Sequence, residues 1–394
     1  MKKLKILIYS DLFLQKSGYA KEMRDIMPHI KKAGHEVAYV ALWYGGYPLI
    51  QDMKVYPTTG KEMSSAWAPE ALQYAIEDFN PDIVLTNQDY FPLSAIAFVM
   101  SHPYKCKWVH WGLCDGDGLD FEAREPIKWV HQHVFKTKFA KRQVQEVERT
   151  IDGEIVEPPL DSAVFHELDK VALRKEYNLD KAKIVLCVAR PQMRKNIPVL
   201  LEAMKLVIKE VPEAILILAA THKPKSFDGG YDCHDVENFV AKFGLEDRVI
   251  IPRNKDKTPI TDEVINIQYN LADVNVLPSL GEGFGLTVTE AGACGVPTIG
   301  TDCSSLHEVI ADRGLLVSPR AHLYSANGVK QAVLHPEDLA NAIVRMLKDD
   351  KLREVTGQRA KEYALKLTPE SRAKALLKIF DETIKKDKKN LMIK

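Results

Sequence analysis

The strongest constraint on the fold is an alternation of short apolar segments with helical segments, which runs through the chain twice. The first series contains LKILIYS (residues 4–10), HEVAYVALW, PDIVLTN, CKWVHWG and HVFKTK. The second contains KIVLCVA (183–189), AILILAA (214–220), RVIIP (248–252), DVNVLPS (273–279), VPTIGT (296–301) and GLLVSP (314–319). Apolar strands separated by helices are typical of a parallel sheet covered on both faces.

Two consecutive prolines, Pro158 and Pro159, separate the two series. We therefore predict two α/β domains, each a doubly wound parallel sheet, at residues 1–165 and 166–366, followed by a C-terminal helix at 367–394. A single sheet is disfavoured because its strand number would approach the practical limit of about ten. Ligands of doubly wound sheets bind beyond the carboxyl ends of the strands, so we expect a site in a cleft between the two domains.

Composition excludes several classes of protein. Hydrophobic residues make up 46% of the chain and the formal net charge is zero, so we expect a globular protein that does not bind nucleic acid. The six cysteines form no C-x-x-C pair, which favours free thiols in a reducing compartment. The apolar run at residues 6–9 is too short for a signal peptide, and no segment approaches the length of a membrane span. We expect a cytoplasmic protein.

Residues 281–295, GEGFGLTVTEAGACG, combine a glycine-rich turn with a helix. The turn lets the backbone approach a ligand, and the free N–H groups at the helix start favour an anion such as a diphosphate. Glu282 and Glu290 would lie about 12 Å apart on one helix, too far for an acid/base dyad but suited to the two ends of an extended ligand. The alternative is a tight turn with two surface glutamates, because such a spacing often arises by chance.

The longer segment PSLGEGFGLTVTEAGACGVPTIGTDCSSLHEVI resembles the donor-binding block of the family 4 retaining glycosyltransferases, which have the GT-B fold. The matching positions are Pro278, Ser279, Glu282 to Leu286, Glu290, Ala291, Ala293, Gly295 and Pro297, with Glu308 after the next turn. The resemblance implies two Rossmann-like domains facing a cleft, with the donor held mainly by the C-terminal domain. It also implies donor contacts from Glu282, Gly283, Phe284, Gly285, Leu286, Thr287 and Glu290.

The segment KIVLCVARPQMRKNIPVLLEAM is similar to another motif of the same family, a strand followed by a pair of basic residues. On this resemblance Arg190 and Lys195 hold the donor diphosphate. Fixed cations stabilise the negative charge that grows on the leaving phosphate, so both join Glu282 as predicted catalytic residues. We expect Arg194 to be an ordinary solvated loop residue and Asn196 to cap the next helix.

The N-terminal half carries weaker signals. SGYAKEMRDIMPHIKKAGHEV is similar to the first loop and helix of the family, which places Ser17 and Gly18 near the donor or acceptor. His110 ends a predicted strand where the family has a histidine that touches the donor sugar, and a histidine satisfied in the core is the alternative. Asp115 and Asp117 form a D-x-D that we interpret as an acceptor contact or a polar turn.

These observations predict a retaining glycosyltransferase that moves a hexose from a nucleotide-diphosphate sugar to a glycan, lipid or protein-linked acceptor. We expect the donor base near Pro252 and Arg253, with no cofactor and no required metal. The alternatives are a nucleotide-sugar epimerase and a non-catalytic sugar-nucleotide-binding subunit. A pyridoxal-phosphate phosphorylase is disfavoured, because it would need a Schiff-base lysine motif that the sequence lacks. The basic tail IKKDKKNLMIK is typical of a solvated helix end, and peripheral contact with anionic lipid is the alternative.

Overall fold

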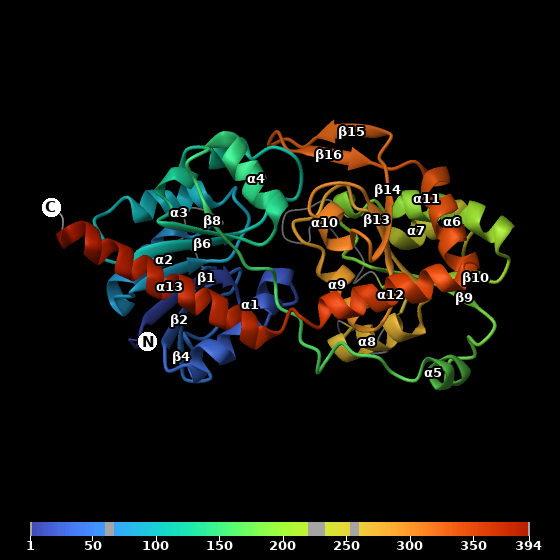
Figure 1. Cartoon of the computed structure of the whole chain (residues 1–394), viewed down its shortest axis with the longest axis horizontal. Helices are drawn as coiled ribbons and strands as arrows, with labels where there is room; N and C mark the ends of the chain where they lie inside the picture. Colours follow the sequence, from blue (N-terminus) through green and yellow to red (C-terminus); the bar gives the residue numbers. More distant parts are fainter. Residues whose placement is uncertain (1, 60–66, 220–232, 253–259, 393–394) are drawn as a thin grey trace. The chain divides into compact units, whose positions relative to one another are not determined.

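The computed structural model describes residues 2–59, 67–219, 233–252 and 260–392, with side chains described up to residue 386. Its contacts divide the chain into two compact units. Unit 1 comprises Met1–Pro159, Ala326–Val329 and Leu367–Lys394, and unit 2 comprises Leu160–Ser325 and Lys330–Lys366. The division assigns residues 160–165 to unit 2, whereas the sequence placed the boundary after residue 165. Figure 1 shows the elements of both units.

Unit 1 contains a sheet of strand order β3-β4-β2-β1-β5-β6-β7-β8, in which every pairing except β3 with β4 is parallel. The strands are β1 (Lys5–Asp11), β2 (Glu36–Leu42), β3 (Leu49–Ile50), β4 (Met53–Pro57), β5 (Ile83–Thr86), β6 (Lys107–Gly112), β7 (Gln132–Phe135) and β8 (Gly153–Ile155). The five predicted strands are all present. The sequence missed β3, β4 and β8, and it extended β7 too far, because the chain turns into a helix at Lys138.

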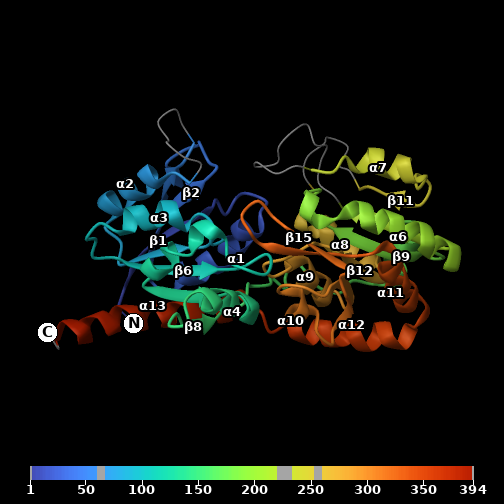
Figure 2. The same ribbon diagram turned by 90° about the horizontal axis from the view of Figure 1, so that it is seen from above.

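Helices cover both faces of this sheet. They are α1 (Gly18–Lys32), α2 (Pro69–Phe79), α3 (Leu93–Met100), α4 (Lys138–Val147) and α13 (Pro369–Met392), with 3-10 turns η1 (Phe121–Ala123) and η2 (Pro126–Trp129). Side chains alternate along β1, so Leu7 and Tyr9 join the apolar cluster of α2, α3 and α4, while Ile6 and Ile8 join that of α1 and α13. Figure 2 shows α13 along one face and α2 with α3 on the other.

Unit 2 confirms the second predicted doubly wound sheet. Its six parallel strands have the order β11-β10-β9-β12-β13-β14. They are β9 (Lys183–Val188), β10 (Ala214–Ala219), β11 (Val249–Ile250), β12 (Val274–Leu277), β13 (Thr298–Thr301) and β14 (Gly314–Val317). The order reverses between β9 and β12, and this switch point is where such sheets bind ligands, beyond the carboxyl ends of the strands.

Helices surround the sheet of unit 2 as well. They are α5 (Lys170–Glu176), α6 (Ile197–Glu210), α7 (Val236–Phe243), α8 (Asp262–Leu271), α9 (Leu286–Ala293), α10 (Leu306–Ile310), α11 (Pro336–Lys348) and α12 (Asp350–Ala364), with the 3-10 turn η3 (Met193–Lys195). Residues of α6, α7 and α11 form one apolar cluster with the sheet. The antiparallel hairpin of β15 (Ala321–Tyr324) and β16 (Lys330–Val333) was not predicted.

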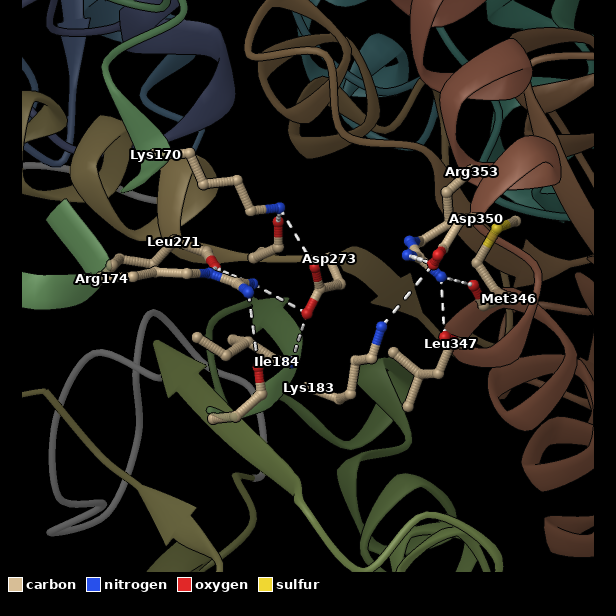
Figure 3. Close-up of polar contacts among 12 residues, drawn as sticks. Lys170, Arg174, Lys183, Ile184, Leu271, Asp273, Met346, Leu347, Asp350 and Arg353 are labelled. Carbon is tan, nitrogen blue, oxygen red and sulfur yellow. Dashed lines mark hydrogen bonds and ion pairs between the residues drawn. The ribbon is translucent and has the colours of Figure 1, made fainter. Parts of the chain in front are cut away.

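A buried carboxylate fixes the amino ends of β9 and β12 (Figure 3). Asp273 accepts a hydrogen bond from the N–H of Ile184 at 2.7 Å and pairs with Lys170 at 3.2 Å and Arg174 at 2.8 Å. Burial opposes its ionisation, but the two cations and the N–H bond outweigh burial and lower the pKa of Asp273. The network ties α5 to the two central strands at the end of the sheet opposite the ligand-binding edge.

Candidate active site

Two loops meet at the switch point of unit 2. One follows β9 and carries Arg190, Arg194 and Lys195, and the other follows β12 and carries the glycine-rich turn 281–285. They are joined directly, because the N–H of Leu280 donates to the carbonyl of Arg194 at 2.8 Å. The parallel register of β9 and β12 thus brings together two motifs that lie about 90 residues apart in the sequence.

The carboxylate of Glu282 is the centre of this meeting point. Its Oε1 pairs with the ammonium of Lys195 and accepts a hydrogen bond from the Ser279 hydroxyl at 2.5 Å. Its Oε2 lies 3.3 Å from Arg194, which also donates to the carbonyl of Gly281 at 3.0 Å. The prediction that Arg194 is an ordinary solvated residue is therefore wrong, since the pairing of β9 with β12 places Gly281 and Glu282 beside it.

The charges around Glu282 decide its protonation. Burial favours the neutral acid, but the positive charges of Lys195 and Arg194 with hydrogen bonds from Lys195 and Ser279 lower the pKa of Glu282 to about 2. The side chain is only 7% exposed and stays ionised at neutral pH. A buried anion in this state accepts hydrogen bonds from hydroxyl groups, but it cannot donate a proton.

The glycine-rich turn leads straight into α9. Gly285 adopts a φ of +91°, where a Cβ atom would come within 3.0 Å of Leu306, so the turn requires glycine there. Among the predicted donor contacts, Gly283, Phe284 and Gly285 are buried. Leu286 and Thr287, in the first turn of α9, are half-buried and face solvent in part.

Glu290 lies inside α9 and is buried. Its Oε2 accepts a hydrogen bond from the hydroxyl of Tyr269 at 2.8 Å, and burial together with this carboxylate raises the pKa of Tyr269 well above its ordinary value. The alternative of two surface glutamates is therefore wrong for both Glu282 and Glu290. The predicted contact of Glu290 with the donor stays a prediction, and one of its oxygens is already bonded within unit 2.

Several other predicted residues are accounted for by local structure. Arg190 is half-buried at the end of β9, and Lys195 closes η3 with a side chain that is 14% exposed. Asn196 precedes α6 in the left-handed conformation and makes no side-chain cap bond, so that capping prediction is wrong. Ser17 caps α1 by accepting from the N–H of Ala20 at 3.1 Å, and Gly18 is exposed in the first turn. Pro252 is half-buried, whereas Arg253 lies outside the described residues.

His110 lies in the core of unit 1 on β6 and has no exposed surface. Its Nδ1 is 2.8 Å from the hydroxyl of Thr86, and its ring meets that of Tyr90 edge to face. Burial, with the charges of His133 and Lys136, holds the pKa of His110 well below its ordinary range. The core interpretation therefore describes His110 in this structure, and its contact with a sugar stays a prediction.

A second glutamate–lysine pair lies at the carboxyl edge of the sheet in unit 1. Lys136 follows β7 and pairs with Glu22 of α1 at 2.6 Å, and their side chains are 0% and 3% exposed. The ammonium also lies over the rings of Tyr19 and Trp111, 4.5 and 4.9 Å from their centroids. The amide of Asn87 donates to Glu22 at 3.0 Å. This pair was not predicted from the sequence.

The D-x-D segment shows no metal-binding arrangement. Asp117 is exposed and Asp115 half-buried, and within the described part of the chain no group of three histidine, cysteine or acidic side chains is placed to hold a metal ion. Nor does any described helix have the length and apolarity to cross a membrane.

Comparisons with known proteins point to the same unit. Residues 169–363 match the family model described as glycosyl transferases group 1. The chain is 25% identical over 329 residues to D-inositol 3-phosphate glycosyltransferase of Corynebacterium jeikeium (strain K411), covering 76% of this chain and 72% of that protein. It is 29% identical over 208 residues to N-acetyl-alpha-D-glucosaminyl L-malate synthase of Bacillus anthracis, covering 52% of this chain and 46% of that protein.

Solved structures share the fold across nearly the whole chain. Sucrose-phosphate synthase from Thermosynechococcus elongatus is similar with a TM-score of 0.80 and 20% identity, covering 96% of this chain and 99% of that one. Anabaena Alr3699/HepE in complex with UDP-glucose is similar with a TM-score of 0.72 and 15% identity, covering 96% of this chain and 100% of that one. At these identities the likeness concerns the fold alone.

Proposed function

We propose that the chain moves a hexose from a nucleotide-diphosphate sugar to an acceptor hydroxyl with retention of configuration. Its residues 169–363 match the group 1 glycosyltransferases, and it is a transferase with the GT-B fold. The observation that carries this proposal is the ionised, buried Glu282 among Lys195, Arg194 and Ser279 at the switch point of unit 2. Cations suited to a diphosphate and a carboxylate suited to sugar hydroxyls lie side by side there.

In the proposed reaction, Glu282 accepts hydrogen bonds from hydroxyls of the donor sugar. Lys195 and Arg190, with the N–H groups of the first turn of α9, hold the diphosphate. As the bond between the anomeric carbon and the phosphate oxygen breaks, negative charge grows on that oxygen and the nearby cations stabilise it. The acceptor oxygen bonds to the anomeric carbon on the face from which the phosphate leaves, and the departing phosphate oxygen takes the acceptor proton.

Retention through a covalent intermediate would need a carboxylate that attacks the anomeric carbon. We assign Glu282 to hydroxyl binding instead, because its two oxygens are held by Lys195, Arg194 and Ser279. On this proposal no glycosyl-enzyme accumulates, and the product keeps the anomeric configuration of the donor. Mass spectrometry that traps a sugar on Glu282, or NMR that finds an inverted product, would contradict the mechanism.

We also propose that no metal takes part, since Arg190, Arg194 and Lys195 can supply the positive charge that a metal supplies elsewhere. Activity that is lost in EDTA and restored by Mg²⁺ or Mn²⁺ would contradict this. A nucleotide-sugar epimerase is disfavoured, because it needs acid/base groups around the sugar C2, and the low pKa of Glu282 makes this carboxylate both ionised and weakly basic. The acceptor is proposed only as a glycan, lipid or protein-linked hydroxyl, in the cytoplasm or at a membrane surface.

The test is a panel of nucleotide-diphosphate sugars, screened by thermal stabilisation and then by transfer to simple sugar acceptors. A true donor at a hundred times its dissociation constant should stabilise the protein by about 2.7 kcal/mol. We expect one base and one sugar to stand out, and the same donor to be consumed in the transfer assay. If every donor fails to stabilise the protein and none is consumed, the proposed function is wrong.

A further inference from the structure

The segment after β13 reaches back to the backbone of Glu282. The N–H of Glu282 donates to the hydroxyl of Ser304 at 2.9 Å, and the hydroxyl of Ser305 donates to the carbonyl of Glu282 at 2.6 Å. Both serines are buried. The peptide groups on the two sides of the Glu282 Cα are therefore each held by a serine hydroxyl, and we call Ser304 and Ser305 the serine clasp.

The conformation of Ser304 makes the clasp unusual. Its φ is 46°, in the left-handed region, which is unfavourable for any residue with a Cβ atom and which glycine adopts freely. Serine therefore destabilises the backbone at this position relative to glycine. The hydroxyl is what serine adds, and it accepts from the N–H of Glu282. Local strain that the surrounding structure maintains is a feature of functional sites.

We infer that Ser304 and Ser305 are positioning residues that hold the Glu282 carboxylate between Lys195 and Ser279. The inference rests on the proposed function, in which that carboxylate binds hydroxyls of the donor sugar. The clasp holds the loop after β12, whereas the diphosphate-binding cations come from the loop after β9. Loosening the clasp should therefore disturb the sugar end of the donor more than the diphosphate end.

The decisive variant is Ser304→Gly, because it removes the hydroxyl and relieves the left-handed strain together. We expect its thermal midpoint to stay close to that of the native protein, because relief of the strain offsets the lost hydrogen bond of the Glu282 N–H. We expect kcat to fall about tenfold to a hundredfold, as misplacement of a reacting group does. The Kd for uridine diphosphate or guanosine diphosphate, whichever binds, should change by less than about twofold. A Ser304→Gly variant with native kcat, whatever its thermal midpoint, would overturn the inference.

Further variants separate the hydroxyl from the rest of the side chain. Ser305→Ala should lower kcat, and Ser305→Thr, which keeps a hydroxyl, should restore part of it. His307→Ala is the matched control, since its exposed side chain lies on the same segment and its ring pairs with Asp302. If Ser305→Ala and His307→Ala have the same kcat, the clasp does not position Glu282.

Amide hydrogen exchange tests the clasp without any turnover. The Glu282 N–H should be protected in the native protein and should exchange faster in Ser304→Ala and Ser304→Gly, with Leu277 on β12 as an internal reference. If no donor is turned over but the variants lose this protection, the proposed function is wrong, while Ser304 and Ser305 still hold the loop after β12. If the Glu282 amide exchanges rapidly in the native protein, the clasp itself is wrong.

Discussion

Each unit places a glutamate–lysine pair at the carboxyl edge of its sheet, yet the two pairs differ in access to solvent. In unit 1, Lys136 and Glu22 are enclosed, with side chains 0% and 3% exposed and aromatic rings against the ammonium. In unit 2, Lys195 and Glu282 are 14% and 7% exposed and share their site with Arg194 and Ser279. The same two residue types therefore meet at equivalent places in two sheets, in different surroundings.

The difference separates a pair that supports a fold from a pair that can bind a ligand. A fully enclosed pair satisfies its charges internally, and burial lowers the pKa of Lys136 against the opposing effect of Glu22. A pair with an accessible cation and an extra arginine carries positive charge beyond what the carboxylate neutralises. We expect changes in unit 1 to alter stability and changes in unit 2 to alter catalysis.

The largest effect should come from breaking the enclosed pair. Lys136→Met leaves Glu22 buried without its cation, and such changes cost about 3–5 kcal/mol. Urea unfolding of the variant should show this loss in the free energy of unfolding. The double variant Glu22→Leu/Lys136→Met is the control, because an apolar replacement of both partners is often close to neutral. If Lys136→Met is as stable as the native protein, the enclosed pair does not support the fold, and the two pairs do not differ in this respect.

As the pH falls, we expect unit 1 to lose stability at a higher pH than the one at which the contribution of Glu282 to stability is lost. Burial lowers the pKa of His133 to about 4, against the opposing effect of its hydrogen bond to the carbonyl of Ile127. Between pH 6.5 and 4 the unfolded chain therefore binds more protons at this residue than the folded chain, and the free energy of unfolding falls by about 3 kcal/mol. Glu282, whose pKa falls from 4.5 to about 2, loses its contribution only as pH drops below about 4.5.

Hydrogen exchange at a series of pH values measures this difference, because each peptide fragment can be assigned to unit 1 or unit 2. Amides of β6 and β7 should lose protection before those of β9 and β12. His133→Gln should flatten the pH dependence between 6.5 and 4. Loss of protection in unit 2 first, at a pH above 4.5, would show that the histidines of unit 1 do not set the acid response.

In unit 2 the expected effect is on rate. Glu282→Gln keeps the size of the side chain and removes its charge, so kcat should fall about a hundredfold, which corresponds to about 2.7 kcal/mol of transition-state stabilisation. Steady-state transfer with the donor found in the panel measures it. Glu210→Gln is the matched control, because Glu210 is an exposed glutamate of the same unit, paired with Lys348. Equal kcat values for the two variants would remove Glu282 from the mechanism.

The smallest expected effect is on ground-state binding. Arg190→Ala combined with Lys195→Ala should weaken nucleoside diphosphate binding about tenfold, since hydrogen bonds to charged groups contribute about 1.5–3 kcal/mol each and neighbouring cations compensate in part. Isothermal calorimetry measures the affinity, and circular dichroism checks that the fold is retained. Unchanged affinity would mean that the loop after β9 does not hold the diphosphate.

The sequence predicted the strands that are apolar throughout and missed those without that signal. All six strands of unit 2's sheet were identified, whereas β15 was missed because each of its side chains is exposed. Strands β3 and β8 are two and three residues long, too short for a periodic pattern. Apolar periodicity reports burial between helices, so the short strands and the exposed hairpin escape it, as does β4, whose five residues include an exposed lysine.

At the site, the motif identified Glu282 and Lys195 but not their surroundings. Arg194, Ser304 and Ser305 act on Glu282 through the register of β9, β12 and β13, which spacing along the chain does not specify. The signal for Ser304 is its left-handed backbone, which only coordinates reveal. His110 was open to a functional and a core interpretation, because a strand-end histidine has the same sequence pattern in both.

The packing of α13 on unit 1 has a consequence for synthesis on the ribosome. Ile6 and Ile8 are translated long before Leu376 and Phe380, yet all four belong to one apolar cluster. About 210 residues must be added between the end of β8 and the start of α13, which takes about 10–40 s at 5–20 residues per second. Throughout that interval one apolar face of the nascent sheet has only α1 to cover it. The covering of the unit 1 sheet is thus completed only after unit 2 has been synthesised.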